Sequence, residues 1–138
     1  ACAWVIGEYH TALDDAAEGT FVRAAKALLA KPIQVLDPAI QSQCVWAATK
    51  LYLGSTRLGA PGVVAELHEL LSSQLPAFAR STQVDVSERA TLSLRLVAFF
   101  KGESARLDAG KPLVEEELRP VHADAQKALP VPPELALD

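Results

Sequence analysis

Apolar residues recur at helical spacing along most of this chain, and Pro or Gly separates one run from the next. Hydrophobic residues make up 50% of the sequence, but aromatic residues only 6%, and Ala and Leu dominate the remainder. Ala and Leu are the strongest helix formers, and long β-branched runs are missing. The sequence therefore predicts an all-α fold.

Size and charge exclude several classes of protein. The chain has 138 residues and is 22% charged, which suits one domain with a packed core and excludes an intrinsically disordered chain. Two cysteines are too few for a disulfide-stapled scaffold. A net charge of -4 argues against binding to nucleic acid or anionic membranes. No window approaches 18 uninterrupted apolar residues, so we expect no membrane span.

The first two helices are expected over residues 1–13 and from about 16 to 30. Gly7 interrupts the first helix at a cost of roughly 1 kcal/mol relative to Ala, which indicates that a neighbouring helix approaches closely there. Asp14 or Asp15 is the expected N-cap of the second helix, and Pro32 ends it. The apolar positions expected to face the core are Cys2, Val5 or Ile6, Tyr9, Leu13, Phe21, Ala25, Leu28 and Leu29.

The next two helices carry clear boundary signals. Asp37 as N-cap and Pro38 at the first helical position start the third helix, which ends near Gly54. The fourth follows the turn at residues 59–62 and is expected to close at Pro76. The predicted core positions are Ile40, Cys44, Ala47, Leu51, Val63, Val64, Leu67, Leu70, Leu71 and Leu75.

A fifth helix is expected to begin at Asp85, with Glu88 three residues later in the spacing of a capping box. Its apolar residues form two stripes, so we expect it to lie between two neighbours. One stripe is Val86, Ala90, Leu94 and Val97, and the other is Leu92, Leu96 and Phe99 or Phe100.

The spacing of the helices favours a repeat architecture. Helix starts near residues 1, 38 and 85 are separated by roughly 37 and 47 residues, close to the period of HEAT and armadillo hairpins. We therefore predict a right-handed α-solenoid of about three helical pairs over 1–118, including a short helix over 111–118. Four prolines between Pro120 and Pro133 predict an extended Pro-rich tail over 119–138. An up-down bundle shares the same local pattern.

No catalytic or metal-binding constellation emerges from the pattern. His10, His68 and His122 fall on separate segments, and none has a second His four residues away, as a zincin helix would require. We interpret His68 as a solvent-facing residue. Cys2 and Cys44 lie at expected core positions, where Cys is commonly a small buried hydrophobe. The sequence therefore predicts no catalytic, cofactor or metal residues.

The remaining candidates have simpler readings. Residues 115–117 are three consecutive glutamates, which spread around a helix and cannot converge on one ion. The serines and threonine at 72–73 and 81–82 lie near helix ends, and the glycines at 54, 59 and 62 lack the Lys-Ser/Thr of a phosphate loop. Residues 130–133 suit either a ligand for an aromatic groove or an ordered extended tail.

Several stretches resemble the large-chain adaptins of vesicle-coat adaptor complexes. The run from Trp4 to Tyr9 is similar to the Trp-Ile-x-Gly-Glu-Tyr/Phe helix of their trunk solenoids. Residues 41–52, ending Thr-Lys-Leu-Tyr, residues 85–90, and the tail at 117–138 resemble the delta chain of adaptor complex three. Residues 53–62 and 102–112 do not share the likeness. The opening Ala-Cys-Ala-Trp and the lack of Met are typical of a slice from a longer chain.

The resemblance implies a non-catalytic scaffold with no cofactor. Its implied partners are a second large chain, a medium chain and a small chain, with recruitment to the cytoplasmic face of Golgi and endosomal membranes by an Arf-type GTPase. The implied process is transport to lysosomes or vacuoles, and no cargo-binding residue carries over. Two alternatives stay open: another helical-repeat scaffold, such as a coatomer large chain or an importin-like carrier, and a small helical enzyme with Cys2 or Cys44 beside a histidine.

Overall fold

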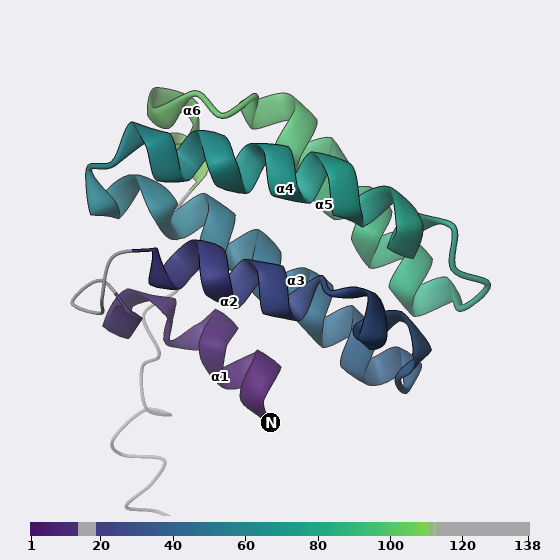
Figure 1. Ribbon diagram of the computed structural model, residues 1–138. Helices are drawn as coiled ribbons and strands as arrows, with labels where there is room; N and C mark the ends of the chain where they lie inside the picture. Colours follow the sequence, from purple (N-terminus) through teal and green to yellow (C-terminus); the bar gives the residue numbers. More distant parts are fainter. Residues whose placement is uncertain (14–18, 111, 113–138) are drawn as a thin grey trace, which may run out of the picture.

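The computed structural model describes residues 1–13, 19–110 and 112, and these residues form helices joined by short turns (Figure 1). The α-helices are α1 (Cys2–Glu8), α2 (Thr20–Leu28), α3 (Pro38–Gly54), α4 (Pro61–Ala79), α5 (Val84–Phe100) and α6 (Ser104–Gly110). Three 3-10 turns, η1 (His10–Leu13), η2 (Lys31–Val35) and η3 (Ser55–Leu58), follow α1, α2 and α3. The described part of the chain contains no strand, which confirms the all-α prediction.

The helices form two layers. Helix α3 packs against α1 on one side and α5 on the other, while α2 packs against α4. Figure 1 shows α2 and α4 in front of α3 and α5, with α1 at one end of the stack and α6 at the other. Helices α3 and α5 run in the same direction, as expected when successive helical hairpins stack on one another.

The central helix is α3, whereas the sequence pattern suggested the fifth helix. From Cys44 to Gly54 every residue of α3 except Trp46 is buried, because α1, α2, α4, α5 and α6 all contact it. Helix α5 buries one stripe, made of Val86, Ala90, Ser93, Val97 and Phe100. The second predicted stripe was wrong in part: Leu92 is 50% exposed and Phe99 65% exposed, whereas Leu96 packs against the core and Phe100 is buried.

Two predicted helix boundaries agree with the structure. The Asp37 side chain caps α3, since its Oδ1 accepts a hydrogen bond from the Ala39 N–H at 2.9 Å, and Pro38 occupies the first turn. Helix α2 ends at Leu28, shortly before Pro32, and the predicted stripe from Phe21 to Leu29 is buried. The expected N-cap at Asp14 or Asp15 lies outside the described residues.

Other boundaries differ from the prediction. Helix α1 stops at Glu8 and continues as the 3-10 turn η1. Helix α4 runs through Pro76 to Ala79. Only three residues of the helix follow the proline, and burial of Phe78 in the core offsets the lost backbone hydrogen bond.

The start of α5 also departs from the sequence pattern. Gln83 is the N-cap residue of α5, and no side chain caps the helix, so the capping box expected at Asp85 does not form. The Ser87 hydroxyl instead donates to the carbonyl oxygen of Ala79 at 2.9 Å, which ties the first turn of α5 to the end of α4. The predicted helix over 111–118 and the Pro-rich tail lie outside the described residues, while the structure adds α6, which the sequence pattern did not predict.

Candidate functional site

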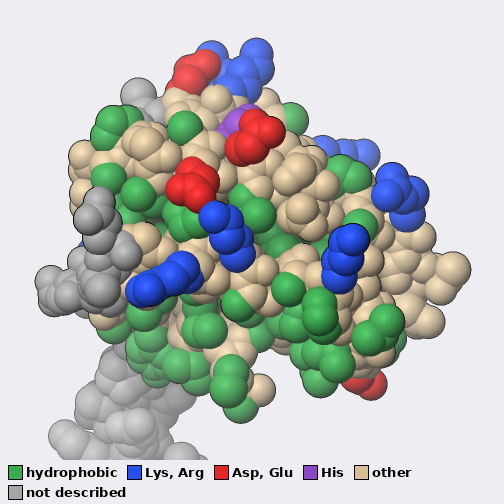
Figure 2. Space-filling model, viewed as in Figure 1, with side chains coloured by type: hydrophobic (Ala, Val, Ile, Leu, Met, Phe, Trp, Pro, Cys, Tyr) green, Lys and Arg blue, Asp and Glu red, His purple; other side chains and the backbone are tan. Residues whose placement is uncertain are grey.

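The outer side of α1 carries a cluster of exposed large apolar side chains at one end of the stack. Trp4, Val5 and Tyr9, here called the α1 outer face, are each about half exposed, with the Trp4 and Tyr9 rings edge to face at 6.1 Å. In Figure 2 hydrophobic side chains gather along the lower edge of the molecule, whereas acidic and basic side chains are more frequent above it. Monomeric surfaces rarely concentrate aromatic residues in this way without a partner.

An open apolar groove of about 550 Å³ continues this surface between α1, α2 and α3. Trp4, Leu28, Ile33 and Ile40 line it, together with Cys2. Two sequence predictions are wrong here, because Cys2 is exposed and Ile40 is 47% exposed. Their side chains face the groove and not the core.

Two glycines allow α1 to lie directly on α3. A Cβ at Gly7 would approach Ala47 Cα at 3.0 Å, so a larger residue would force the two helices apart. This confirms the close approach predicted from Gly7. Gly54, near the other end of α3, makes room for the His10 ring, which would lie 2.4 Å from a Cβ at that position.

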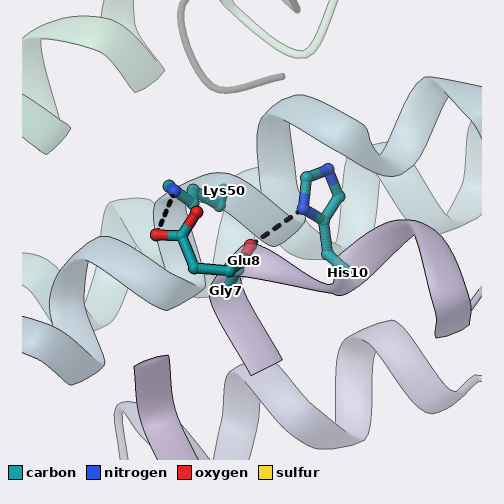
Figure 3. A network of polar contacts seen from close by, with 4 residues as sticks. All are labelled: Gly7, Glu8, His10 and Lys50. Atoms are coloured by element: carbon teal, nitrogen blue, oxygen red, sulfur yellow. Dashed lines mark hydrogen bonds and ion pairs between the residues drawn. The ribbon is translucent and has the colours of Figure 1, made fainter. Parts of the chain in front are cut away.

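Polar contacts then fix the position of α1 (Figure 3). The Lys50 ammonium lies 2.6 Å from Glu8 Oε1, with 8% and 24% of the two side chains exposed. His10 is buried, and its Nδ1–H donates to the Gly7 carbonyl oxygen at 2.9 Å. Burying either charge without its partner would cost several kcal/mol of folding free energy, so Glu8 and Lys50 have to stay in contact. Their contact therefore fixes where α1 lies on α3.

Helix α3 reaches its other neighbours through residues close to Lys50. The Thr49 hydroxyl is 2.8 Å from the Ser93 hydroxyl of α5, and both residues are fully buried. Tyr52 Oη accepts a hydrogen bond from the Gly102 N–H at 2.9 Å and lies within hydrogen-bond distance of His68 Nδ1, at 3.2 Å. The interpretation of His68 as solvent-facing was therefore wrong: its ring is held between α4 and α3.

These contacts join two of the sequence stretches that resemble adaptins, residues 4–9 and residues 41–52. Gly7 and Glu8 belong to the first stretch, and Thr49, Lys50 and Tyr52 to the second. The glycine permits contact with α3, and the glutamate pairs with the lysine of the second stretch. These residues thus hold one layer of helices together. The sequence showed only the spacing of these residues within each stretch. It did not show that Glu8 of one stretch pairs with Lys50 of the other.

The cysteines do not form a nucleophilic site in the described part of the chain. Neither Cys2 nor Cys44 hydrogen-bonds a histidine there, and burial raises the pKa of the Cys44 thiol above its ordinary value. Cys44 is therefore protonated at neutral pH and poorly nucleophilic. Burial likewise raises the pKa of the Tyr52 hydroxyl above 10.0, against the smaller opposite effect of the Gly102 hydrogen bond.

The remaining candidate residues are placed as follows. Among residues 1–13, 19–110 and 112, no three His, Cys, Asp or Glu side chains come close enough to hold a metal ion. His122, the glutamates at 115–117 and the prolines at 130–133 lie outside the described residues. No described helix combines the length and hydropathy needed to cross a bilayer.

Comparison with known proteins identifies a relative. The chain is 31% identical over 149 aligned positions to a bovine protein, AP-3 complex subunit delta-1, and the match covers 100% of this chain. It covers 12% of the bovine subunit, so the chain corresponds to about an eighth of that relative's length. No protein-family model matches the chain. No solved structure matches it either.

The relative agrees with the resemblance seen in the sequence, and the fold is the all-helical one that this resemblance implies. The match runs from one end of the chain to the other, so it includes the α1–α3–α5 layer described above. The chain is therefore a relative of one segment of an AP-3 delta subunit.

Proposed function

We propose that this chain is a non-catalytic scaffold segment of a delta-type large subunit in an adaptor complex for vesicle-mediated protein transport. In this role its helical pairs are part of a right-handed solenoid, and the Pro-rich residues 119–138 lead away from the trunk. The partners are the second large chain, the medium chain and the small chain. The whole complex works on the cytoplasmic side of Golgi and endosomal membranes, where an Arf-type GTPase recruits it, in transport towards lysosomes or vacuoles.

The observation that carries the proposal is the α1 outer face at one end of a two-layer helical stack. Helix α3 is covered on both sides by α1 and α5, whereas among the described helices α1 packs mainly on α3 and leaves Trp4, Val5 and Tyr9 about half exposed. In a solenoid each repeat contacts only its neighbours, and the surface of an outermost helix is built to be covered by the next. Burying the exposed half of each aromatic ring, about 100 Å², stabilises the contact by roughly 2 kcal/mol per ring, at about 25 cal/mol per Å² of apolar surface.

Co-purification tests the assignment. The full-length parent chain is tagged and isolated from its own organism, and the medium and small adaptor subunits are expected among the proteins that co-purify in equal amounts. Failure to recover either subunit would overturn the proposal.

A matched pair of variants tests the role of the α1 outer face in the same full-length chain. Trp4→Glu places a charge on that face and is expected to lower the yield of assembled complex. Val84→Glu makes a comparable change at a 66% exposed position in the first turn of α5, where a carboxylate is tolerated, and the yield should stay at the wild-type level. Equal yields for the two variants would contradict a packing role for α1.

A further inference from the structure

A second groove, of about 710 Å³, lies between the amino-terminal halves of α3 and α5. Here called the α3–α5 groove, it is lined on α3 by positions 39, 42, 43 and 46 and on α5 by positions 85, 88, 89 and 92. Both sets follow the spacing i, i+3, i+4, i+7, which is one face of a helix. Two helices running in the same direction therefore present matching faces across one channel.

The channel exists because the side chains on α3 are small where those on α5 are charged. Ala39 and Ser42 cannot fill the space between the helices, and Asp85 and Glu88 are exposed at the opposite side. Helices packed for stability alone would bring apolar side chains together along this seam. The carboxy-terminal halves of the same helices leave no such channel: the Thr49 and Ser93 hydroxyls lie 2.8 Å apart, and Val97 is buried.

The electrostatics of the groove are unbalanced. The Arg89 guanidinium lies over the Trp46 ring, 5.7 Å from its centroid, and makes no ion pair in the described part of the chain. Within those same residues no basic side chain pairs with Asp85 or Glu88. A carboxylate in the first turn of a helix interacts favourably with the helix dipole, and this effect explains the presence of Asp85. It does not explain why Glu88 and the Trp46 ring also line the groove.

The groove also offers two apolar contacts beside the carboxylates. Trp46 is partly buried, with its ring held by Arg89, and Leu92 is 50% exposed one turn beyond Glu88. A rigid aromatic ring and an exposed aliphatic side chain are typical anchors for peptide side chains. An acidic rim beside them attracts a Lys or Arg and repels anionic lipid and nucleic acid.

We propose that the α3–α5 groove binds a short segment of a partner protein that carries a Lys or Arg next to an apolar side chain. The basic side chain pairs with Asp85 and Glu88, and the apolar side chain packs on Trp46 and Leu92. This site is separate from the α1 outer face, and the proposal does not depend on which repeats flank the segment.

Selection from a random library tests the proposal directly. A phage library of seven-residue peptides is selected on the 138-residue chain, and the enriched peptides are expected to contain a Lys or Arg within two positions of Leu, Ile, Val or Phe. No enrichment, or enrichment of peptides without a basic residue, would overturn the proposal.

Affinity measurements then locate the site. In a Trp4→Phe background Trp46 is the only tryptophan, so its fluorescence reports binding of a synthetic copy of the most enriched peptide. We expect Asp85→Asn combined with Glu88→Gln to weaken binding about fivefold, the loss expected for two exposed ion pairs. Raising the salt concentration from 50 mM to 500 mM should also weaken peptide binding to the wild-type chain, because salt screens the attraction between exposed charges.

A matched control removes the same charge elsewhere. Glu66→Gln combined with Glu69→Gln neutralises two exposed carboxylates of α4, outside the groove, and should leave the affinity within twofold of wild type. Circular-dichroism melts of both double variants separate a folding defect from a binding defect. If the groove variant melts like wild type and binds the peptide as well as the control does, the proposal is wrong.

Discussion

Substitution of Gly54 by Ala gives the sharpest test of how α1 is seated on α3. A Cβ at this position would lie 2.4 Å from His10 Cδ2 and 2.6 Å from His10 Nε2. Ordinary contact begins near 3.4 Å, so the ring would have to retract by about 1 Å. That movement breaks the 2.9 Å hydrogen bond from His10 Nδ1 to the Gly7 carbonyl oxygen.

The expected change in the free energy of unfolding follows from three contributions. Overpacking at a buried site costs about 2 kcal/mol, and the lost hydrogen bond adds about 1 kcal/mol. Ala gains up to about 1 kcal/mol over Gly in a helix, and the φ of -78° at Gly54 is compatible with Ala. Gly54→Ala should therefore destabilise the chain by about 2 kcal/mol, which lowers the Tm by roughly 8 °C.

The assay is urea denaturation followed by far-ultraviolet circular dichroism, carried out as a double-mutant cycle. In a His10→Ala background the ring is gone, so Gly54→Ala should stabilise the chain by up to about 1 kcal/mol. The expected coupling energy is thus about 3 kcal/mol. Gly62→Ala is the control, because a Cβ there meets no atom within 4 Å and should not destabilise. A coupling energy below about 0.5 kcal/mol would refute the packing argument.

Three further predictions concern buried charge, pH and the faces of α5. Lys50→Met should cost about 2 kcal/mol, measured by urea denaturation, because it leaves a partly buried carboxylate without its ammonium partner; wild-type stability would contradict the role of this ion pair. Stability should fall as the pH rises above about 9, since the folded chain holds the protons of Cys44 and Tyr52 more tightly than the unfolded chain does. Urea midpoints between pH 8 and 10.5 measure this, and Cys44→Ala should reduce the fall near pH 9. Val97→Asp should unfold the chain, whereas Phe99→Asp should change its stability by less than about 0.5 kcal/mol, as read from thermal melts; equal loss in both would mean that α5 is buried on two sides.

Sequence reasoning succeeded where a residue acts on its own backbone. Asp37 and Pro38 start a helix through local hydrogen bonding and a fixed φ, so the prediction needed no knowledge of neighbours. Gly7 indicated a close contact because a helix has no local reason to contain Gly. The predicted capping box at Asp85 does not form. Which residue becomes the N-cap of α5 depends on the path of the chain from α4 into α5, and the local sequence does not fix that path.

The degree of burial was harder to predict from composition. Helix α3 buries Ser42, Thr49 and Lys50 along with its apolar residues, and these polar groups concealed its central position. Helix α5 has its apolar residues more clearly gathered on one side than α3 does, but it leaves Leu92 and Phe99 exposed. A buried polar residue is acceptable only when a partner from another helix satisfies it, and the partner cannot be seen in one sequence.

The sequence by itself determined the all-α class, the positions of most helices and the likeness to the delta adaptins, because propensity and local spacing are properties of a continuous stretch of chain. Only the tertiary structure decided that α3 is the central helix, that Glu8 meets Lys50, and that α3 and α5 leave a groove between them. These features depend on contacts between residues about 40 positions apart. Such contacts arise when helices pack, and the pattern within either helix does not specify them.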